Sequence, residues 1–488
     1  EAAVNIHRLP GQGLVSLPFS TYPSFIYYRP ALFDAAGLAY PPHSFGELYD
    51  GATWDTAKLR EISMLLTLDI NGKNATDIDF DPNQIVQWGF TQQFSELRGY
   101  VTMFGASHPI DATGTAFLPT PYADGFPWYY DGMWVDHFIP NAEQKAAMDN
   151  NPFMSGKLAM ANSHLWYTCC AGVNDWDIAV VPSYNGVYTA KLHDDGFRIM
   201  ETTEHPQEAF TVLTYLIGEA APDLLAVYHG MPARPADQPA FFAALDADFP
   251  QGVDWQVAMD SINYADSPNL EAMIPNYQVA YDRLVEFQLL IESTDGLDIA
   301  TELADLIADL QIIASERLAD GGFEGELLYF WSQKNVTGDK VKCNTPEKQV
   351  AFEGECAYRF KGGVGEKSKL IQNAETVYVL AGKDLTLSGM VNAKGAPNAT
   401  VKVIVTYQNT SLPKGKLKAK INAPTSGYQP LTGNLSLTLS DDALAIKVQF
   451  GNKSVSGKIY LDALSLTTTG SATANLISLP PLPALPLP

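Results

Sequence analysis

The sequence predicts an α/β domain followed by an all-β sandwich and a short extended tail. Two changes in texture along the 488 residues predict this division. Up to about residue 320, short apolar runs alternate with helical patterns, and beyond it come short strand-like segments separated by turn residues. Residues 479–488 then alternate Pro with Leu. We therefore expect domains at 1–320 and 321–470, with a Pro/Leu-rich tail at 471–488.

Charge is distributed unevenly between these parts. Residues 1–330 hold 13 Lys+Arg against 45 Asp+Glu, whereas residues 331–488 hold 18 against 10. The formal net charge of −24 argues against a nucleic-acid ligand, because phosphate binding requires a basic face. No run of 18 or more apolar residues occurs, which excludes a membrane-spanning helix of ordinary composition. The 46% hydrophobic and 18% charged content is typical of a folded protein.

The first domain is expected to open with strand, loop and strand over residues 13–28, followed by a helix that ends near Gly37. A second helix should start at Trp54-Asp55, and an amphipathic helix over Leu297–Leu318 should close the domain before Gly321 and Gly322. The expected strands of the second domain are Val377–Leu380, Leu385–Val391, Thr400–Tyr407, Leu435–Leu439, Leu444–Phe450 and Lys458–Leu466. This pattern is typical of a sandwich or jelly roll.

Several short motifs follow one another through the first domain. They are Gly13–Tyr28, Arg29–Phe33, Pro41–Phe45, Phe153–Met160, Trp176–Pro182, His205–Ala209, Gly230–Arg234 and Tyr264–Asn276. Their order resembles the extracellular solute-binding proteins of ABC importers, in the sugar-binding branch, over roughly residues 10–318. The resemblance implies two α/β lobes of the periplasmic-binding-protein type, joined by a hinge and closing on a ligand. Members usually carry a long stretch before the first motif, so we expect the first lobe to be incomplete here.

The same resemblance implies a set of ligand contacts. Trp166 should face the ligand from a loop, with Asn162, Ser163 and His164 supplying hydrogen bonds from the same loop. Such a set suits a sugar, because aromatic planes cover the apolar face of the ring and polar groups pair with its hydroxyls. Core packing is the alternative for Trp166, and a structural role is the alternative for His164.

Three further residues are candidates. Thr21 and Tyr22 should lie in a loop after the Leu17-Pro18 strand and contact the ligand. Arg234 suits a hydroxyl or a carboxylate, although an ion pair with the scaffold is equally compatible with its position. The aromatic run Trp128–Tyr130, together with Trp134, either lines the cleft or packs the interior, and packing is favoured.

The four cysteines form two pairs along the chain. Cys343 and Cys356 enclose a 12-residue loop, and in an exported chain we expect a disulfide that contributes about 3 kcal/mol in the chain-entropy model. Cys169 and Cys170 are adjacent, and a vicinal disulfide and two reduced thiols are both compatible with the sequence.

The second domain resembles the jelly-roll modules related to carbohydrate-binding modules. The likeness rests on Gly322-Phe-Glu324 at its start and on Tyr460–Leu466 at its end. It implies a structural calcium ion near Glu324 and Asp462, although Ala463 replaces the usual second Asp. The alternating lysines of Lys414–Lys420 form either a solvated edge, which we favour, or a patch that contacts an acidic envelope polymer.

These observations favour a receptor without enzymatic activity. We expect it to bind a small carbohydrate by hinge closure and to deliver it to ABC permease subunits, with no cofactor other than the structural calcium. We place it at the cell surface or in the periplasm, tethered through a segment before Glu1, with envelope polysaccharide as a further partner. One alternative is a structural or adhesive surface protein, and another is a hydrolase with a carboxylate pair about 5–10 Å apart.

Overall fold

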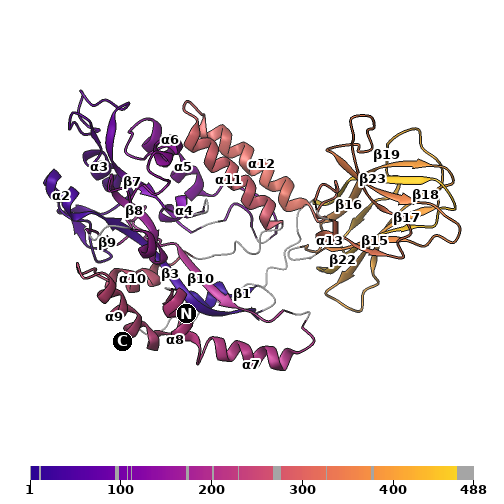
Figure 1. Cartoon of the computed structure of the whole chain (residues 1–488), viewed down its shortest axis with the longest axis horizontal. Helices are drawn as coiled ribbons and strands as arrows, with labels where there is room; N and C mark the ends of the chain where they lie inside the picture. Colours follow the sequence, from indigo (N-terminus) through magenta and orange to yellow (C-terminus); the bar gives the residue numbers. More distant parts are fainter. Residues whose placement is uncertain are drawn as a thin grey trace. The chain divides into compact units, whose positions relative to one another are not determined.

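The structure is a computed structural model, which describes residues 2–9, 13–93, 98–106, 108–111, 113–171, 175–200, 203–228, 230–266, 276–325, 327–374 and 379–469. The chain divides into two compact units (Figure 1). Unit 1 contains Glu1–Pro109, Leu118–Glu271 and Tyr281–Ile307, and unit 2 contains Ile110–Phe117, Ala272–Ala280 and Ala308–Pro488. The division falls inside the helix Ile299–Ser315, upstream of the boundary expected at residue 320. The expected tail at 471–488 lies outside the described residues.

Helices and strands alternate through the first 315 residues. The helices are α1 Ala2–Ile6, α2 Pro30–Ala36, α3 Thr56–Leu65, α4 Arg98–Val101, α5 Thr120–Trp134, α6 Ala142–Ala146, α7 Pro206–Leu216, α8 Ala221–Tyr228, α9 Gln238–Asp248, α10 Gln256–Ser261, α11 Tyr277–Ser293 and α12 Ile299–Ser315, with short 3-10 turns at η1 Thr102–Phe104, η2 Leu165–Cys170, η3 Pro235–Asp237 and η4 Ile262–Tyr264. The strands are β1 Arg8–Leu9, β2 Gly13–Leu14, β3 Leu17–Tyr28, β4 Leu48–Tyr49, β5 Ala52–Thr53, β6 Leu68–Asp69, β7 Ile85–Gln92, β8 Leu158–His164, β9 Asp177–Ala179, β10 Leu192–Phe197 and β11 Met231–Pro232.

A mixed seven-stranded sheet forms the centre of unit 1. Its order is β10-β3-β8-β7-β6, and β9 and β11 also pair with β3. The pairing of β7 with β8 is parallel, and the other pairings are antiparallel. Helix α3 packs on β7 and α10 packs on β3 (Figure 1). A Cβ atom on Gly89 of β7 would lie 2.0 Å from the Ser63 carbonyl oxygen of α3, so this close packing requires glycine.

The two helix boundaries expected near the start of the chain are confirmed. Helix α2 ends at Gly37, which adopts the left-handed conformation with a φ of 68°. Helix α3 starts after Asp55, whose side chain accepts a hydrogen bond from the Lys58 N–H and thus satisfies a free donor of the first turn. The expected loop within residues 13–28 is wrong, because Leu17–Tyr28 is one continuous strand.

Unit 2 consists mainly of two antiparallel six-stranded sheets. The elements are α13 Leu327–Phe330, β12 Ser332–Lys334, β13 Lys340–Cys343, β14 Cys356–Lys361, β15 Lys369–Ala374, β16 Asp384–Lys394, β17 Ala399–Tyr407, β18 Gly415–Ile421, β19 Gln429–Pro430, β20 Gly433–Asn434, β21 Ser436–Thr438, β22 Ala443–Asn452 and β23 Lys458–Thr469. We name the two sheets J and K. Sheet J has the order β13-β14-β23-β16-β19, with β21 also paired with β16, and sheet K has the order β12-β15-β22-β17-β18-β20. Apolar side chains from both sheets form one core, so the unit is a two-layer sandwich.

Most of the expected strands of the second domain are present. Strands β16, β17, β21, β22 and β23 overlap five of the six predictions. In the remaining one, Val377–Leu380, Val379 and Leu380 are not in a strand, and the other residues lie outside the described part. The predicted closing helix corresponds to α12. Among the described residues, no helix is both long and apolar enough to cross a membrane.

Candidate functional site

The parallel strands β7 and β8 end side by side in unit 1. Gln92, the last residue of β7, lies opposite Asn162 near the end of β8. In α/β sheets, ligands bind beyond the carboxyl ends of parallel strands. The expected contacts Asn162, Ser163 and His164 therefore lie at such an end, but they belong to β8 and not to a loop as expected.

One face of the antiparallel strands β3, β8 and β10 gathers polar and aromatic side chains. His164 lies opposite Ser24, and His193 lies opposite Tyr22. Because side chains alternate between the two faces of a sheet, Tyr22, His164 and His193 share one face. The rings of His164 and His193 have centroids 5.5 Å apart, and those of Tyr22 and His193 are 6.3 Å apart. Lys191 belongs to the same face, since it precedes His193 by two residues.

His164 is held by two hydrogen bonds in the interior. Its Nδ1 lies 3.1 Å from the Tyr22 carbonyl oxygen, and its Nε2 lies 3.3 Å from Lys191 Nζ. A carbonyl can only accept and an ammonium can only donate, so these partners assign the proton to Nδ1 of a neutral imidazole. His164 and Lys191 are 2% and 1% exposed. The two hydrogen bonds therefore fix the orientation of the His164 ring, which lies next to Trp166.

Trp166 lies in η2, directly after β8, and is half-buried. Its ring centroid lies 6.0 Å from that of His164, with an angle of 31° between the rings, and 6.3 Å from that of Tyr167. Tyr167 itself is buried. The rings of His164 and Tyr167 thus contact Trp166 while part of its indole remains accessible, so the side chain is not completely enclosed in the core.

We name Trp166, His164, Lys191, His193 and Tyr22 the His164 cluster. At the ends of β7 and β8, three buried side-chain amide oxygens have no hydrogen-bond partner among the described residues: Gln92 Oε1, Gln93 Oε1 and Asn162 Oδ1. Buried polar atoms are normally paired, because an unpaired acceptor costs about 1–3 kcal/mol. Hydroxyl groups of a polar ligand are suitable donors to such oxygens.

Two expected contacts point to the opposite face of the sheet. Thr21 lies within β3, and its hydroxyl donates to Asp194 Oδ2 at 3.2 Å, while Asp194 also lies 3.1 Å from His7 Nε2. Ser163 Oγ donates to the Gln93 carbonyl oxygen at 2.9 Å. The expectation that Thr21 and Tyr22 share a loop is wrong, because the two side chains alternate along one strand and point to opposite faces.

The described contacts of Arg234 lie outside the His164 cluster. Its Nη2 donates to the Ile217 carbonyl oxygen at the end of α7, at 2.8 Å. The aromatic run also serves packing: Trp128, Tyr129 and Tyr130 are buried on α5, and Trp134 Nε1 donates to the Ile291 carbonyl oxygen at 2.9 Å. The Trp134 hydrogen bond connects α5 with α11.

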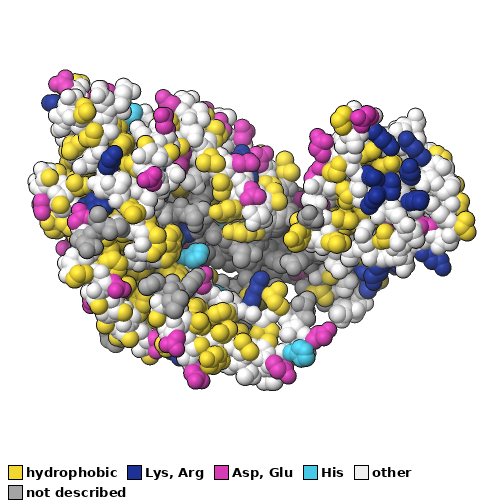
Figure 2. Space-filling model, in the orientation of Figure 1, with side chains coloured by type: hydrophobic (Ala, Val, Ile, Leu, Met, Phe, Trp, Pro, Cys, Tyr) yellow, Lys and Arg dark blue, Asp and Glu magenta, His cyan; other side chains and the backbone are white. Residues whose placement is uncertain are grey.

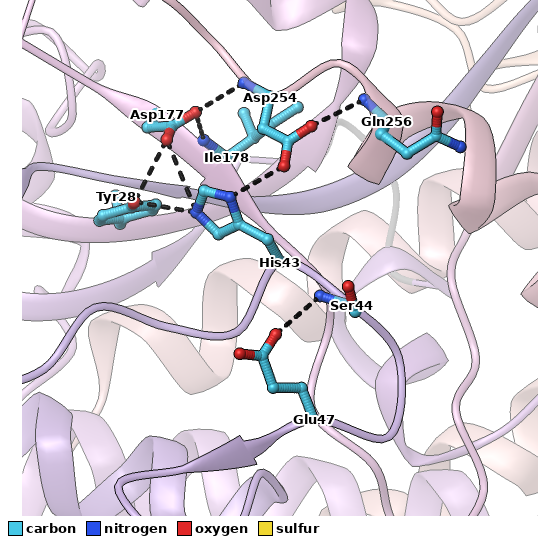
Figure 3. A network of polar contacts seen from close by, with 8 residues as sticks. All are labelled: Tyr28, His43, Ser44, Glu47, Asp177, Ile178, Asp254 and Gln256. Carbon is cyan, nitrogen blue, oxygen red and sulfur yellow. Dashed lines mark hydrogen bonds and ion pairs between the residues drawn. The ribbon is translucent and has the colours of Figure 1, made fainter.

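A separate polar network surrounds His43, which belongs to the Pro41–Phe45 motif (Figure 3). His43 Nδ1 lies 3.1 Å from Asp254 Oδ2, and its Nε2 lies 3.0 Å from the Tyr28 hydroxyl and 3.6 Å from Asp177 Oδ2. Asp177 Oδ1 in turn accepts the Asp254 N–H at 3.0 Å. The network connects the end of β3, the start of β9 and the segment before α10, so it supports the scaffold and lies apart from the His164 cluster.

The cysteines lie at disulfide distance within each pair. Cys343 and Cys356 lie opposite each other on β13 and β14, and their sulfurs are bonded. Cys169 and Cys170 are joined as a vicinal disulfide in η2. The sequence alone was compatible with this disulfide and with two reduced thiols.

The carboxylates expected near calcium bind backbone groups in unit 2. Glu324 Oε1 accepts the N–H groups of Glu355 and Cys356, both at 2.9 Å. Asp462 Oδ2 accepts the N–H groups of Phe352 and Glu353, at 2.6 and 3.2 Å. In the part of the chain that the structure describes, no group of three or more His, Cys, Asp or Glu side chains is arranged to hold a metal ion. A calcium ion at Glu324 and Asp462 stays a prediction.

Comparisons with known proteins show the fold. No protein-family model and no curated protein matches the sequence. The ABC substrate-binding protein Lmo0181 from Listeria monocytogenes, solved with cycloalternan, matches with a TM-score of 0.50 and 15% identity, covering 64% of this chain and 74% of that one. UspC of Mycobacterium tuberculosis has a TM-score of 0.48 and 20% identity, covering 63% and 77%. The sugar-binding protein MalE from Xanthomonas citri has a TM-score of 0.47 and 12% identity, covering 64% and 73%. About two thirds of the chain thus has a solute-binding-protein fold.

Proposed function

We propose that the chain is the extracellular substrate-binding component of an ABC transporter. It binds a carbohydrate reversibly between two lobes that close about a hinge, and it delivers the sugar to a membrane permease. The observation that carries this proposal is the half-buried Trp166 directly after β8, at the same end of the strands at which the amide oxygens of Gln92, Gln93 and Asn162 are unpaired. An aromatic surface next to hydroxyl acceptors suits a sugar ring, and the solute-binding-protein fold supports the same conclusion.

Within the proposal, binding requires no covalent chemistry. Trp166 covers the apolar face of a ring, and His193, which is more exposed than His164, reaches hydroxyl groups at its rim. Ligand affinity for the closed form then shifts the population toward closure. Both cysteine pairs support a location outside the cytoplasm, because disulfides persist in oxidising compartments.

For unit 2 we propose a jelly roll. The strand orders β14-β23-β16-β21 in one sheet and β15-β22-β17-β18 in the other support it. In each sheet a strand from the end of the chain (β23 or β22) lies between two strands from the start of the unit, as in a jelly roll. A jelly roll would serve as a spacer or as an attachment module. The alternative function, a structural or adhesive surface protein, is favoured by the basic residues on the outer face of sheet J, among them Lys361, Lys394 and Lys458.

Calorimetry on the full chain tests the receptor proposal. Cycloalternan is the first probe, since the neighbour Lmo0181 was solved with it. Trp166→Ala should weaken binding by about tenfold or more, because stacking area is lost at the centre of the site. Trp134→Phe is the matched control, as Trp134 lies outside the His164 cluster. Unchanged affinity in Trp166→Ala removes this residue from the site, and a wild-type chain that binds no neutral sugar favours the adhesive alternative.

A further inference from the structure

The outer face of sheet J in unit 2 is densely basic. Along β14, β23 and β16, the side chains that point into the core are Tyr358, Phe360, Ile459, Leu461, Val391 and Ala393. The residues between them must point outward, because side chains alternate along a strand. These outward residues are Arg359, Lys361, Lys458, Tyr460, Asn392 and Lys394. In Figure 2, Lys and Arg side chains gather over the strands that Figure 1 labels β19 and β23.

Three lysines of this face lie in one cross-strand row. Lys458 on β23 lies directly opposite Lys361 on β14 and directly opposite Lys394 on β16. Like charges in such positions destabilise a sheet. Lysines are often placed on edge strands to prevent aggregation, but β23 lies between β14 and β16 and is not an edge. Protection of an exposed sheet edge from aggregation therefore does not explain this row of lysines.

Positive charge dominates the surroundings of this row. The pKa of Lys342 is lowered, first by Lys340 and also by partial burial and by Arg359, Lys348 and Lys458. Two of the carboxylates in this part of the unit are bound to the backbone: Asp339 Oδ1 accepts the Lys361 N–H at 2.7 Å, and Asp462 accepts the N–H groups of residues 352 and 353. The lysine ion pairs among the described residues all belong to unit 1.

A cavity of about 390 Å³ opens on this face. Lys348, Lys394 and Lys458 line it, together with the rings of Phe352, Tyr428 and Tyr460 and the amide of Asn392. Its volume lies in the range of ligand sites, roughly 300–1,000 Å³. The Phe352 and Tyr428 rings have centroids 5.6 Å apart, and the Tyr428 hydroxyl donates to the Val350 carbonyl oxygen at 2.5 Å, which holds the ring in place. Asn392 Oδ1 is buried without a partner among the described residues.

We propose that this cavity binds a sugar residue that carries an anionic group, as part of an acidic glycan. The three lysines pair with a carboxylate, sulfate or phosphate substituent, the rings contact the apolar face of the sugar, and the Asn392 amide pairs with a hydroxyl. The combination favours an acidic sugar over nucleic acid, because a compact cavity with rings and an amide recognises one ring, whereas a nucleic acid requires an extended basic track. The site does not depend on the proposed receptor function of unit 1.

Calorimetry on the full chain, titrated with trigalacturonate, galactose 6-sulfate and glucose 6-phosphate, tests the proposal and distinguishes the three anions. At least one should bind, and fully methyl-esterified trigalacturonate, which lacks the charge, should bind at least about tenfold more weakly than the acid if the carboxylate is the group recognised. The variant K348Q/K394Q/K458Q should weaken binding of the anionic sugar by about tenfold or more.

The matched control is K416Q/K418Q/K420Q, which removes the same charge from exposed positions of β18 in sheet K, outside the cavity. It should change the affinity by less than about threefold, since only screened long-range attraction is lost. Equal losses in both variants, no binding of any of the three anions, or tighter binding of a single-stranded oligonucleotide would overturn the proposal. Trp166→Ala should leave anionic binding unchanged, so failure of the receptor function can be told apart from failure of this site.

Discussion

Lys145 and Glu292 form a largely buried ion pair that connects α6 with α11. Lys145 Nζ lies 3.0 Å from Glu292 Oε1, and Gln288 Nε2 donates to the same oxygen at 3.0 Å. The Tyr100 hydroxyl also donates to this carboxylate. Burial raises the pKa of Glu292 to about 7 and lowers that of Lys145 to about 7, so burial disfavours the charged form of each group. The contact between the two opposite charges favours the charged forms. Each residue therefore depends on the other to remain ionised in the interior.

Removing one member of this pair should be strongly destabilising. Glu292→Gln should lower the free energy of unfolding by about 3–5 kcal/mol, because it leaves a buried ammonium without its counter-charge. The double variant Lys145→Met/Glu292→Leu should lose less, since it removes both charges together. Urea denaturation measures both. Glu61→Gln, which breaks the exposed Lys58–Glu61 pair, is the control and should cost less than about 1 kcal/mol. A double variant as unstable as the single one would contradict this account.

Asp194 should make stability depend on pH. Burial is the main cause that raises its pKa from 3.8 to about 6. Below about pH 3.8 the carboxyl is neutral in both the folded and the unfolded chain. Above that pH the unfolded chain releases its proton first, so this group lowers stability as the pH rises toward and past 6, by roughly 2–3 kcal/mol in total. Asp194→Asn should flatten the stability profile between pH 4 and 7, as measured by urea denaturation. Asp195→Asn, at a more exposed neighbour, should leave the slope in place.

The Cys343–Cys356 disulfide should stabilise unit 2. Replacing both cysteines with serine should lower the free energy of unfolding by about 3 kcal/mol, because the unfolded chain regains the freedom of the enclosed loop. The same replacement at Cys169 and Cys170 should have a much smaller effect, since adjacent residues enclose no loop. Chemical denaturation under non-reducing conditions compares the two variants, and equal losses would show that loop entropy is not the cause.

His43 should stabilise the scaffold of unit 1 without contributing to sugar affinity. His43→Ala leaves Tyr28, Asp177 and Asp254 without their shared partner, and we expect a loss of about 1–3 kcal/mol in unfolding free energy. His43→Gln should restore part of it, because an amide can still donate to a carboxylate. Calorimetry on the same variants supplies the second measurement, and a selective loss of sugar binding at unchanged stability would place His43 in the ligand site instead.

Helix ends and regular strands could be predicted because their signals are local. Gly37 ends α2, Asp55 begins α3, and the stripe Leu303, Leu306 and Leu310 is typical of α12. The prediction of a loop at Thr21 and Tyr22 was wrong because distant contacts, and not local signals, determine the structure there. Prolines and serines around these residues favour a turn locally, but pairing with four distant strands makes the segment a continuous strand.

The same distinction applies to the binding sites. Trp166 and His164 could be proposed because both follow the Phe153–Met160 motif by a few residues, and the structure brings them together. Lys191 and His193 were missed, since the shared face is visible only once the register of β10 against β3 is known. The cavity of unit 2 could not be predicted either, because Lys348, Lys394 and Lys458 come from three separate segments and carry no common pattern.

Strand β3 has a consequence for how the chain acquires its structure. It precedes all of its partners in the chain, which are residues 158–164, 177–179, 192–197 and 231–232. Until those segments leave the ribosome, an aromatic-rich strand has unpaired backbone groups and an uncovered apolar surface. Contacts of such long sequence separation fold slowly and expose intermediates to aggregation. Productive biogenesis of this protein should therefore depend on a chaperone or an export factor that holds β3 until its partner strands have been synthesised.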